Sequence, residues 1–70
     1  MDEQELLHRI SIDTNVNVEV LKDLYHNETF LALIKADQST DAILFIRRNY
    51  PRLGLAGAKF IAEAFVKALK

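Results

Sequence analysis

Apolar residues recur every three or four positions along most of the chain, which is the spacing of an amphipathic helix. The predicted helices run from Asp2 to about Ile10, from after Asn17 to about His26, from after Asn27 to about Ala36, from Ser39 to about Asn49, and from Leu55 or Ala56 to the C-terminus. The second and third become one helix if the chain is not broken at His26 and Asn27. The pattern therefore predicts an all-α fold, a small bundle of four to five short helices forming one domain over residues 1–70.

The same spacing predicts which side chains face the core. They are Leu6, Leu7 and Ile10, then Val18, Leu21, Leu24 and Tyr25, then Phe30, Leu33 and Ile34, then Ile43, Ile46 and Tyr50, and finally Ala58, Ile61, Phe65, Ala68 and Leu69. Asp2 and Ser39 stand where a helix N-cap is expected, since their side chains can accept a backbone N–H.

One segment also carries a competing signal. From Ile10 to Val20 the even positions are Ile, Ile, Thr, Val, Val and Val, whereas the odd ones are polar, and this alternation is typical of a strand. A single strand has no pairing partner within this chain and would expose its edges. We therefore expect a loop from Ser11 to Asn17, with a strand paired across a dimer axis as the alternative.

The residues that break helices are confined to one place. Pro51, Gly54 and Gly57 all lie between positions 51 and 57, at or just after the junction of the last two predicted helices. Pro51 lacks an N–H and disfavours a helical conformation at Tyr50, and Gly54 can adopt a positive φ. Residues 39–69 are thus predicted to form a helical hairpin that turns between Pro51 and Gly54. Ala58 and Ala62, one turn apart, would let its two helices approach closely.

Length and composition limit the setting of this domain. The chain has 70 residues, of which half are hydrophobic and none is cysteine, so disulfides and thiolate zinc sites are excluded. A domain of this size is marginally stable and often depends on an oligomeric contact. No run approaches the roughly 20 apolar residues of a membrane span. The N-terminus is acidic, unlike a signal peptide, so we expect a cytoplasmic location.

Charge is unevenly distributed. Residues 1–34 carry seven acidic and two basic side chains, a net charge of −5, whereas residues 35–70 carry seven basic and three acidic ones, a net charge of +4. Four basic residues surround the predicted hairpin turn: Arg47, Arg48, Arg52 and Lys59. They could dock a carboxylate-rich protein surface or phosphates, or Arg47 and Arg48 could simply complement a helix C-terminus.

Leu44 and Phe45 lie off the predicted inward face of residues 43, 46 and 50. Either the N-terminal helices cover them, which we expect, or they form an exposed apolar patch that marks an interaction site. His8 and His26 lie in different segments, without an acid or cysteine at a spacing that would bind a metal. We expect no catalytic site, no cofactor and no metal, and the slightly acidic chain lacks a nucleic-acid motif.

The segment from Asp41 to Glu63 resembles the helical hairpin in the C-terminal domain of the bacterial ribosomal stalk protein. That family has an Ala-Ile-Lys-x-x-Arg helix, a Gly-Leu-Gly-Leu turn, and Ala-Lys with an acid four residues later. The matching residues here are Ala42, Ile43 and Arg47, then Leu53, Gly54 and Leu55, then Ala58, Lys59 and Glu63, with one extra residue in the turn. Leu44 stands where the family has its lysine, and the resemblance covers the hairpin alone, because the family's domain is α/β.

In the stalk family this hairpin docks translational GTPases, which implies Arg47 and Lys59 as contact residues. The sequence leaves two main hypotheses for function and, as a weaker third one, a nucleic-acid accessory protein. One is a small protein-protein interaction module or regulator that presents Arg47, Arg48, Arg52, Lys59, Leu44 and Phe45 to an acidic protein. The other is a self-associating structural subunit that buries Leu44, Phe45 and the Val-rich N-terminal segment against a second copy.

Overall fold

Helices form in all five predicted segments. The computed structural model describes residues 2–69, and this range contains five α-helices and no strand. The elements are α1 (Glu3–Thr14), α2 (Val18–Tyr25), α3 (Glu28–Lys35), α4 (Ser39–Asn49), the 3-10 helix η1 (Pro51–Leu53) and α5 (Gly54–Leu69). The predicted all-α bundle is therefore confirmed, and the break at His26 and Asn27 separates α2 from α3.

Short polar side chains set the starts of the first three helices. Asp2 accepts a hydrogen bond from the backbone N–H of Glu5 at 2.8 Å, which confirms it as an N-cap. Asn17 and Asn27 do the same for α2 and α3. Each of these bonds satisfies a backbone donor that the helix itself leaves without a partner.

The predicted loop from Ser11 to Asn17 is wrong over its first four residues, because α1 continues to Thr14. The alternation of apolar residues there does not correspond to a strand. Ile10 is buried in α1 and Val16 in the turn after it, whereas Ile12 is 68% exposed. Asn15 ends the helix in the left-handed conformation, with φ at 57°. The Ser11 hydroxyl then donates to the carbonyl of Val16 at 2.6 Å, and this bond closes the turn. The strand alternative is excluded by the same helix.

Ser39 is not an N-cap. It is the first residue of α4, and the residue before it, Gln38, makes no side-chain capping bond. The reason lies in how α3 ends: Asp37 adopts a positive φ of 64°, and the N–H of Gln38 donates to the carbonyl of Leu33 at 2.9 Å. This is the Schellman arrangement of a helix C-terminus. It fixes Gln38 as the last residue of the turn, so α4 begins one residue later.

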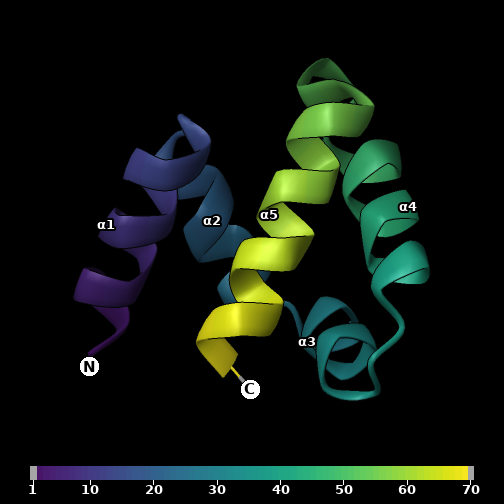
Figure 1. The fold of residues 1–70 in the computed structure, drawn as a ribbon, viewed down its shortest axis with the longest axis horizontal. Helices are drawn as coiled ribbons and strands as arrows, with labels where there is room; N and C mark the ends of the chain where they lie inside the picture. The colour runs from purple at the N-terminus through teal and green to yellow at the C-terminus, as the bar shows by residue number, and fades with distance from the viewer. Residues whose placement is uncertain (1, 70) are drawn as a thin grey trace.

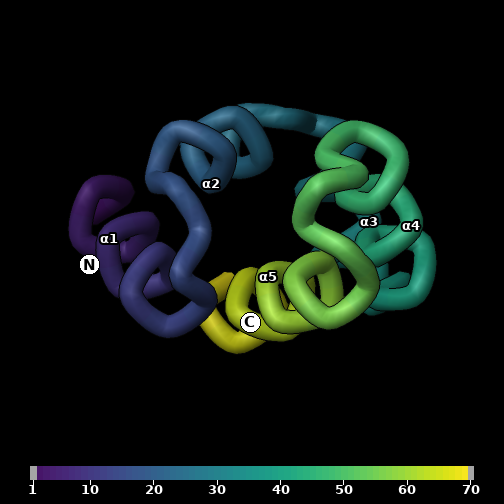
Figure 2. The backbone as a smooth tube through the Cα atoms, turned by 90° about the horizontal axis from the view of Figure 1, so that it is seen from above, coloured from purple at the N-terminus to yellow at the C-terminus, as the bar shows by residue number. Residues whose placement is uncertain are grey.

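The helices α1 to α4 follow one another around α5. Each contacts the next in sequence, and α5 packs against α1, α3 and α4 (Figure 1). Viewed from above, α1 and α2 lie on one side of the molecule and α3 and α4 on the other (Figure 2). Two of the neighbours of α5 run antiparallel to it: α1 and α4 rise in Figure 1 where α5 descends. Within residues 2–69 no helix is both long and apolar enough to cross a bilayer.

The core contains side chains from every α-helix. Its members are Leu7, Ile10, Val16, Leu21, Leu24, Phe30, Ile34, Ala42, Ile46, Ala58, Ile61, Ala62 and Phe65. Most were predicted, but Ile43 is half-buried, Val18 is 40% exposed and Ala68 is exposed. The buried side chains of α4 are Ala42 and, one turn later, Ile46. Ile43 lies at the edge of the buried stripe that Ala42 and Ile46 form.

The hairpin prediction is confirmed, and its turn depends on one glycine. Gly54, which follows η1 and is the first residue of α5, has φ 70° and ψ −179°. This region of backbone space is essentially restricted to glycine, because a Cβ there clashes with the residue's own backbone. Beyond Gly54 and its neighbours along the chain, no atom lies within 4 Å of the position that a Cβ would take. The strain of a substitution at Gly54 would therefore come from the backbone alone.

We accordingly expect Gly54→Ala to lower the free energy of unfolding by about 1–3 kcal/mol. Gly57→Ala is the matched control, since Gly57 is helical and its Cβ would lie 3.3 Å from Leu53 Cβ. Alanine at this helical position should stabilise the helix by about 0.5–1 kcal/mol, and the close contact with Leu53 opposes that gain. Urea titration followed by circular dichroism measures both; an unchanged midpoint for Gly54→Ala contradicts the strain.

Candidate protein-binding surface

A shallow hollow of about 230 Å³ lies between α3 and α4. Its lining comprises Leu33 from α3 and Asp41, Leu44, Phe45 and Arg48 from α4. Apolar side chains make up its floor, while Asp41 and Arg48, two turns apart on α4, provide one charge of each sign. The structure thus brings together three of the residues that the sequence singled out: Leu44, Phe45 and Arg48.

The expectation that the N-terminal helices cover Leu44 and Phe45 is wrong for Leu44, which is open, and Phe45 is covered by α3 and not by α1 or α2. The Leu44 side chain is 42% exposed, and Phe45 is half-buried. The N-terminal helices α1 and α2 make no contact with α4, because α3 and α5 stand between them and it. The apolar side chains that line the hollow are therefore partly exposed to solvent.

Phe45 is held rigidly from below. Its ring lies 5.9 Å from that of Phe30, centroid to centroid, and Phe30 in turn packs edge-to-face on Phe65 at 5.2 Å. Both Phe30 and Phe65 are fully buried. The Asn49 side chain donates to the carbonyl of Phe45 at 2.9 Å and so supports the last turn of α4. The open face of Phe45 is therefore continuous with the core and has little freedom to move.

All four predicted basic residues are exposed, but they do not converge on one point. Arg47 and Arg48 are consecutive in α4 and so point about 100° apart around the helix. Arg48 lines the hollow; Arg47, Arg52 in η1 and Lys59 in α5 lie outside it. Within residues 2–69 none of the four lies within ion-pair distance of a carboxylate oxygen. Their charges are thus available to a partner.

Tyr50 lies at the end of α4, directly before the hairpin turn. Its half-buried ring packs against the core, and burial raises the pKa of its phenol above the usual 10.0. The carboxylate of Asp23 on α2 raises this pKa further by opposing the phenolate charge. Tyr50 therefore lies within electrostatic range of Asp23, although α2 does not pack on α4.

The two histidines lie apart from this surface. Nε2 of His26, after α2, lies 2.5 Å from Oε1 of Glu3 at the start of α1, and His8 is exposed on α1. Within the described residues no three His, Cys, Asp or Glu side chains are grouped closely enough to hold a metal.

Sequence reasoning missed a second exposed apolar site. Phe60 is 58% exposed on α5, beside α1, although it precedes the buried Ile61 by one residue. The sequence does contain a signal for this, because on a helical wheel Phe60 lies about 100° from Ile61 and about 140° from Phe65. Leu33 and Asp41 in the hollow were also missed. Their grouping depends on how α3 and α4 pack, which no local pattern gives.

Comparisons of this chain with protein-family models, with curated proteins and with solved structures found no match. The resemblance of the hairpin to that of the ribosomal stalk protein therefore stays a prediction.

Proposed function

We propose that this chain is a small non-enzymatic protein-binding module or regulator that docks an acidic protein on the outer side of α4. The observation that carries this proposal is the hollow between α3 and α4, where the exposed Leu44 and the rigid Phe45 adjoin Arg48. We place the interaction in the cytoplasm, which the cysteine-free sequence favours.

The two kinds of side chain would have different tasks. Binding energy in protein interfaces is concentrated in a few desolvated anchors, commonly aromatic residues and arginine. Phe45 and Arg48 meet that description, because one is fixed by the core and the other is unpaired. Arg47, Arg52 and Lys59 surround them without carboxylate partners. Charges at such a rim mainly accelerate association with a partner of opposite sign.

Two further considerations support an acidic protein as the partner. The residues after position 34 carry a net charge of +4, so this half of the chain attracts carboxylates over a distance. The resemblance of the hairpin to that of the stalk family, whose hairpin docks GTPases, points the same way for Arg47 and Lys59.

The test uses the chain as immobilised bait in lysate at low salt, with captured proteins quantified by mass spectrometry. We expect Arg47→Glu with Lys59→Glu, and separately Leu44→Ser with Arg48→Glu, to reduce capture of the specific partner at least about tenfold. Like charges brought together in an interface cost several kcal/mol, and 1.4 kcal/mol is tenfold in affinity. Capture by the parent should also weaken steeply as salt rises.

The matched control is Arg9→Glu with Lys22→Glu. It alters the net charge as much as the first variant does, but on α1 and α2, which do not contact α4. Its capture should equal that of the parent, and all variants should keep the parent's helical spectrum. Equal loss in the control and in the α4 variants would show a non-specific charge effect, and undiminished capture by both α4 variants would move the site elsewhere.

A further inference from the structure

The face formed by α1 and α5 carries a protruding aromatic side chain and an apolar groove next to each other. At one end of the groove, Phe60 projects from α5 with 58% of its surface exposed. Toward the other end is a hollow of about 430 Å³ whose apolar lining is Leu6, Ile10, Ala64 and Ala68. Two side chains of α5, Ala64 and Lys67, line both parts and so join them.

We propose that this face binds a second copy of the same chain, with each Phe60 inserted into the groove of the other copy. A two-fold interface requires one surface to hold both a projection and a recess that fits it. The recess is large enough, since a cavity of about 150 Å³ can hold benzene. This surface lies on α1 and α5, so the inference is independent of the function proposed for α4.

The register of the pairing follows from α5 itself. Phe60 and Ala68 lie four residues on either side of Ala64. When two α5 helices cross antiparallel with the two-fold axis at Ala64, Phe60 of one copy comes opposite Ala68 of the other, in the groove. The small side chain of Ala64 at the axis lets the helices approach closely. Because the two-fold axis repeats this contact, Phe60 of each copy lies in the groove of the other.

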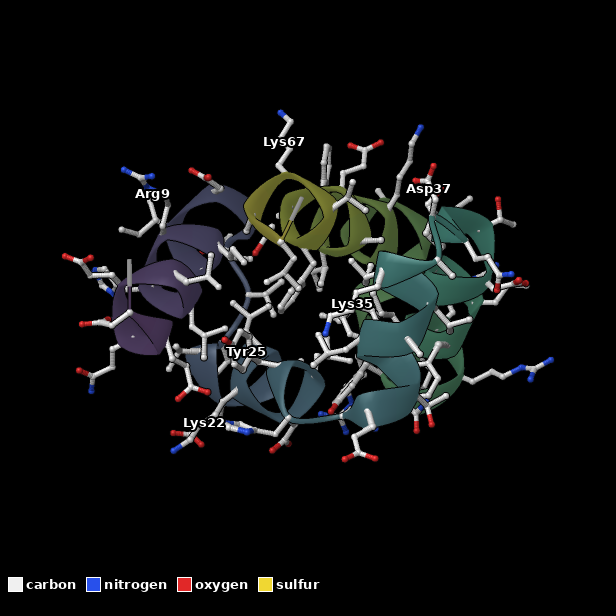
Figure 3. The ribbon with its side chains drawn as sticks, turned by 90° about the horizontal axis from the view of Figure 1, so that it is seen from below. Arg9, Lys22, Tyr25, Lys35, Asp37 and Lys67 are labelled. Atoms are coloured by element: carbon white, nitrogen blue, oxygen red, sulfur yellow. The ribbon has the colours of Figure 1, made fainter. Side chains whose placement is uncertain are left out.

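The charges on this face are complementary in the same register. Glu63 and Lys67 are exposed on α5, and Arg9 and Asp13 line the groove from α1, so the four residues have no net charge. Seen from below, Arg9 and Lys67 both point outward along the edge opposite Lys22 (Figure 3). Across the axis, Lys67 of one copy is offset along the helix by two residues, about 3 Å, from Glu63 of the other. Two copies therefore meet with attraction between these side chains.

Sedimentation equilibrium from low micromolar to millimolar concentration tests the proposal. The parent should form a dimer, and Phe60→Ser should weaken the dimer at least about 30-fold, as expected for a buried aromatic anchor. Lys67→Glu should weaken it as well, and adding Glu63→Lys to that variant should restore it. A parent that stays monomeric throughout, or a Phe60→Ser variant that dimerises like the parent, overturns the proposal. So does a dimer that is lost with Leu44→Ser and kept with Phe60→Ser.

Cross-linking tests the register. Because the chain has no cysteine, Ala64→Cys would introduce a single thiol close to the proposed axis. Under mild oxidation this variant should form a disulfide-linked dimer at concentrations where Lys22→Cys, on the opposite edge of the molecule, remains monomeric (Figure 3). Equal cross-linking of the two variants contradicts the register that places Ala64 at the axis.

Discussion

Replacing Phe65 with alanine should lower the free energy of unfolding by about 3–5 kcal/mol, the usual loss when a buried phenylalanine is truncated. Phe65 is fully buried on α5 and packs edge-to-face on Phe30. A chain of this length has a total stability of about 4–10 kcal/mol, at 0.05–0.15 kcal/mol per residue. The loss should leave much of the protein unfolded at 37 °C, and a thermal melt followed by circular dichroism measures it.

Phe60→Ala is the matched control, because it removes the same atoms from the same helix at a position that is 58% exposed. Measured at low micromolar concentration, it should change stability by no more than about 0.5 kcal/mol, as is usual for exposed sites. Equal melting temperatures for the two variants would show that α5 buries a different face.

The second large effect is expected at Ile46, which is fully buried in α4 where it packs with the core. Ile46→Ala should cost about 2–5 kcal/mol, through lost apolar contact and the cavity that remains. Urea unfolding measures the change, and a loss below about 1 kcal/mol would contradict the packing of α4 on α5.

Leu44→Ala, two residues earlier, separates packing from function. Leu44 is 42% exposed, so the substitution should cost well under the loss at Ile46. If the hollow between α3 and α4 docks a partner, Leu44→Ala should weaken capture while the urea midpoint stays near that of the parent. A large loss of stability would instead show that Leu44 is a structural residue.

The positions of the helices are largely determined by local sequence. The apolar spacing located all five, and the breakers Pro51 and Gly54 located the hairpin turn. Both signals act within a few residues: a helix needs one apolar face and a cap, and a turn needs a residue that tolerates an unusual φ. The N-cap at Asp2 likewise depends only on residues close to it in the sequence.

Boundaries were less predictable where two local signals compete. Ile10, Ile12 and Val16 alternate as in a strand, yet Ile10 and Val16 are buried from a helix and from the turn after it. Ser39 has the side chain of a cap, but the C-terminal turn of α3 occupies the preceding residue and the helix starts at Ser39 itself. In both places packing and the neighbouring helix end outweighed the residue's own preference.

The sequence by itself determined an all-α chain, its hairpin, most of its core and the basic residues around the turn. Tertiary structure alone decided what each surface offers. Leu44 is open because α3 and α5 keep α1 and α2 away from α4, and Phe45 is rigid because Phe30, from another helix, lies beneath it. Phe60 lies at one end of a groove because α1 packs against α5. Periodicity gives the face of each helix, but which residues share a surface depends on contacts between segments that are distant in sequence.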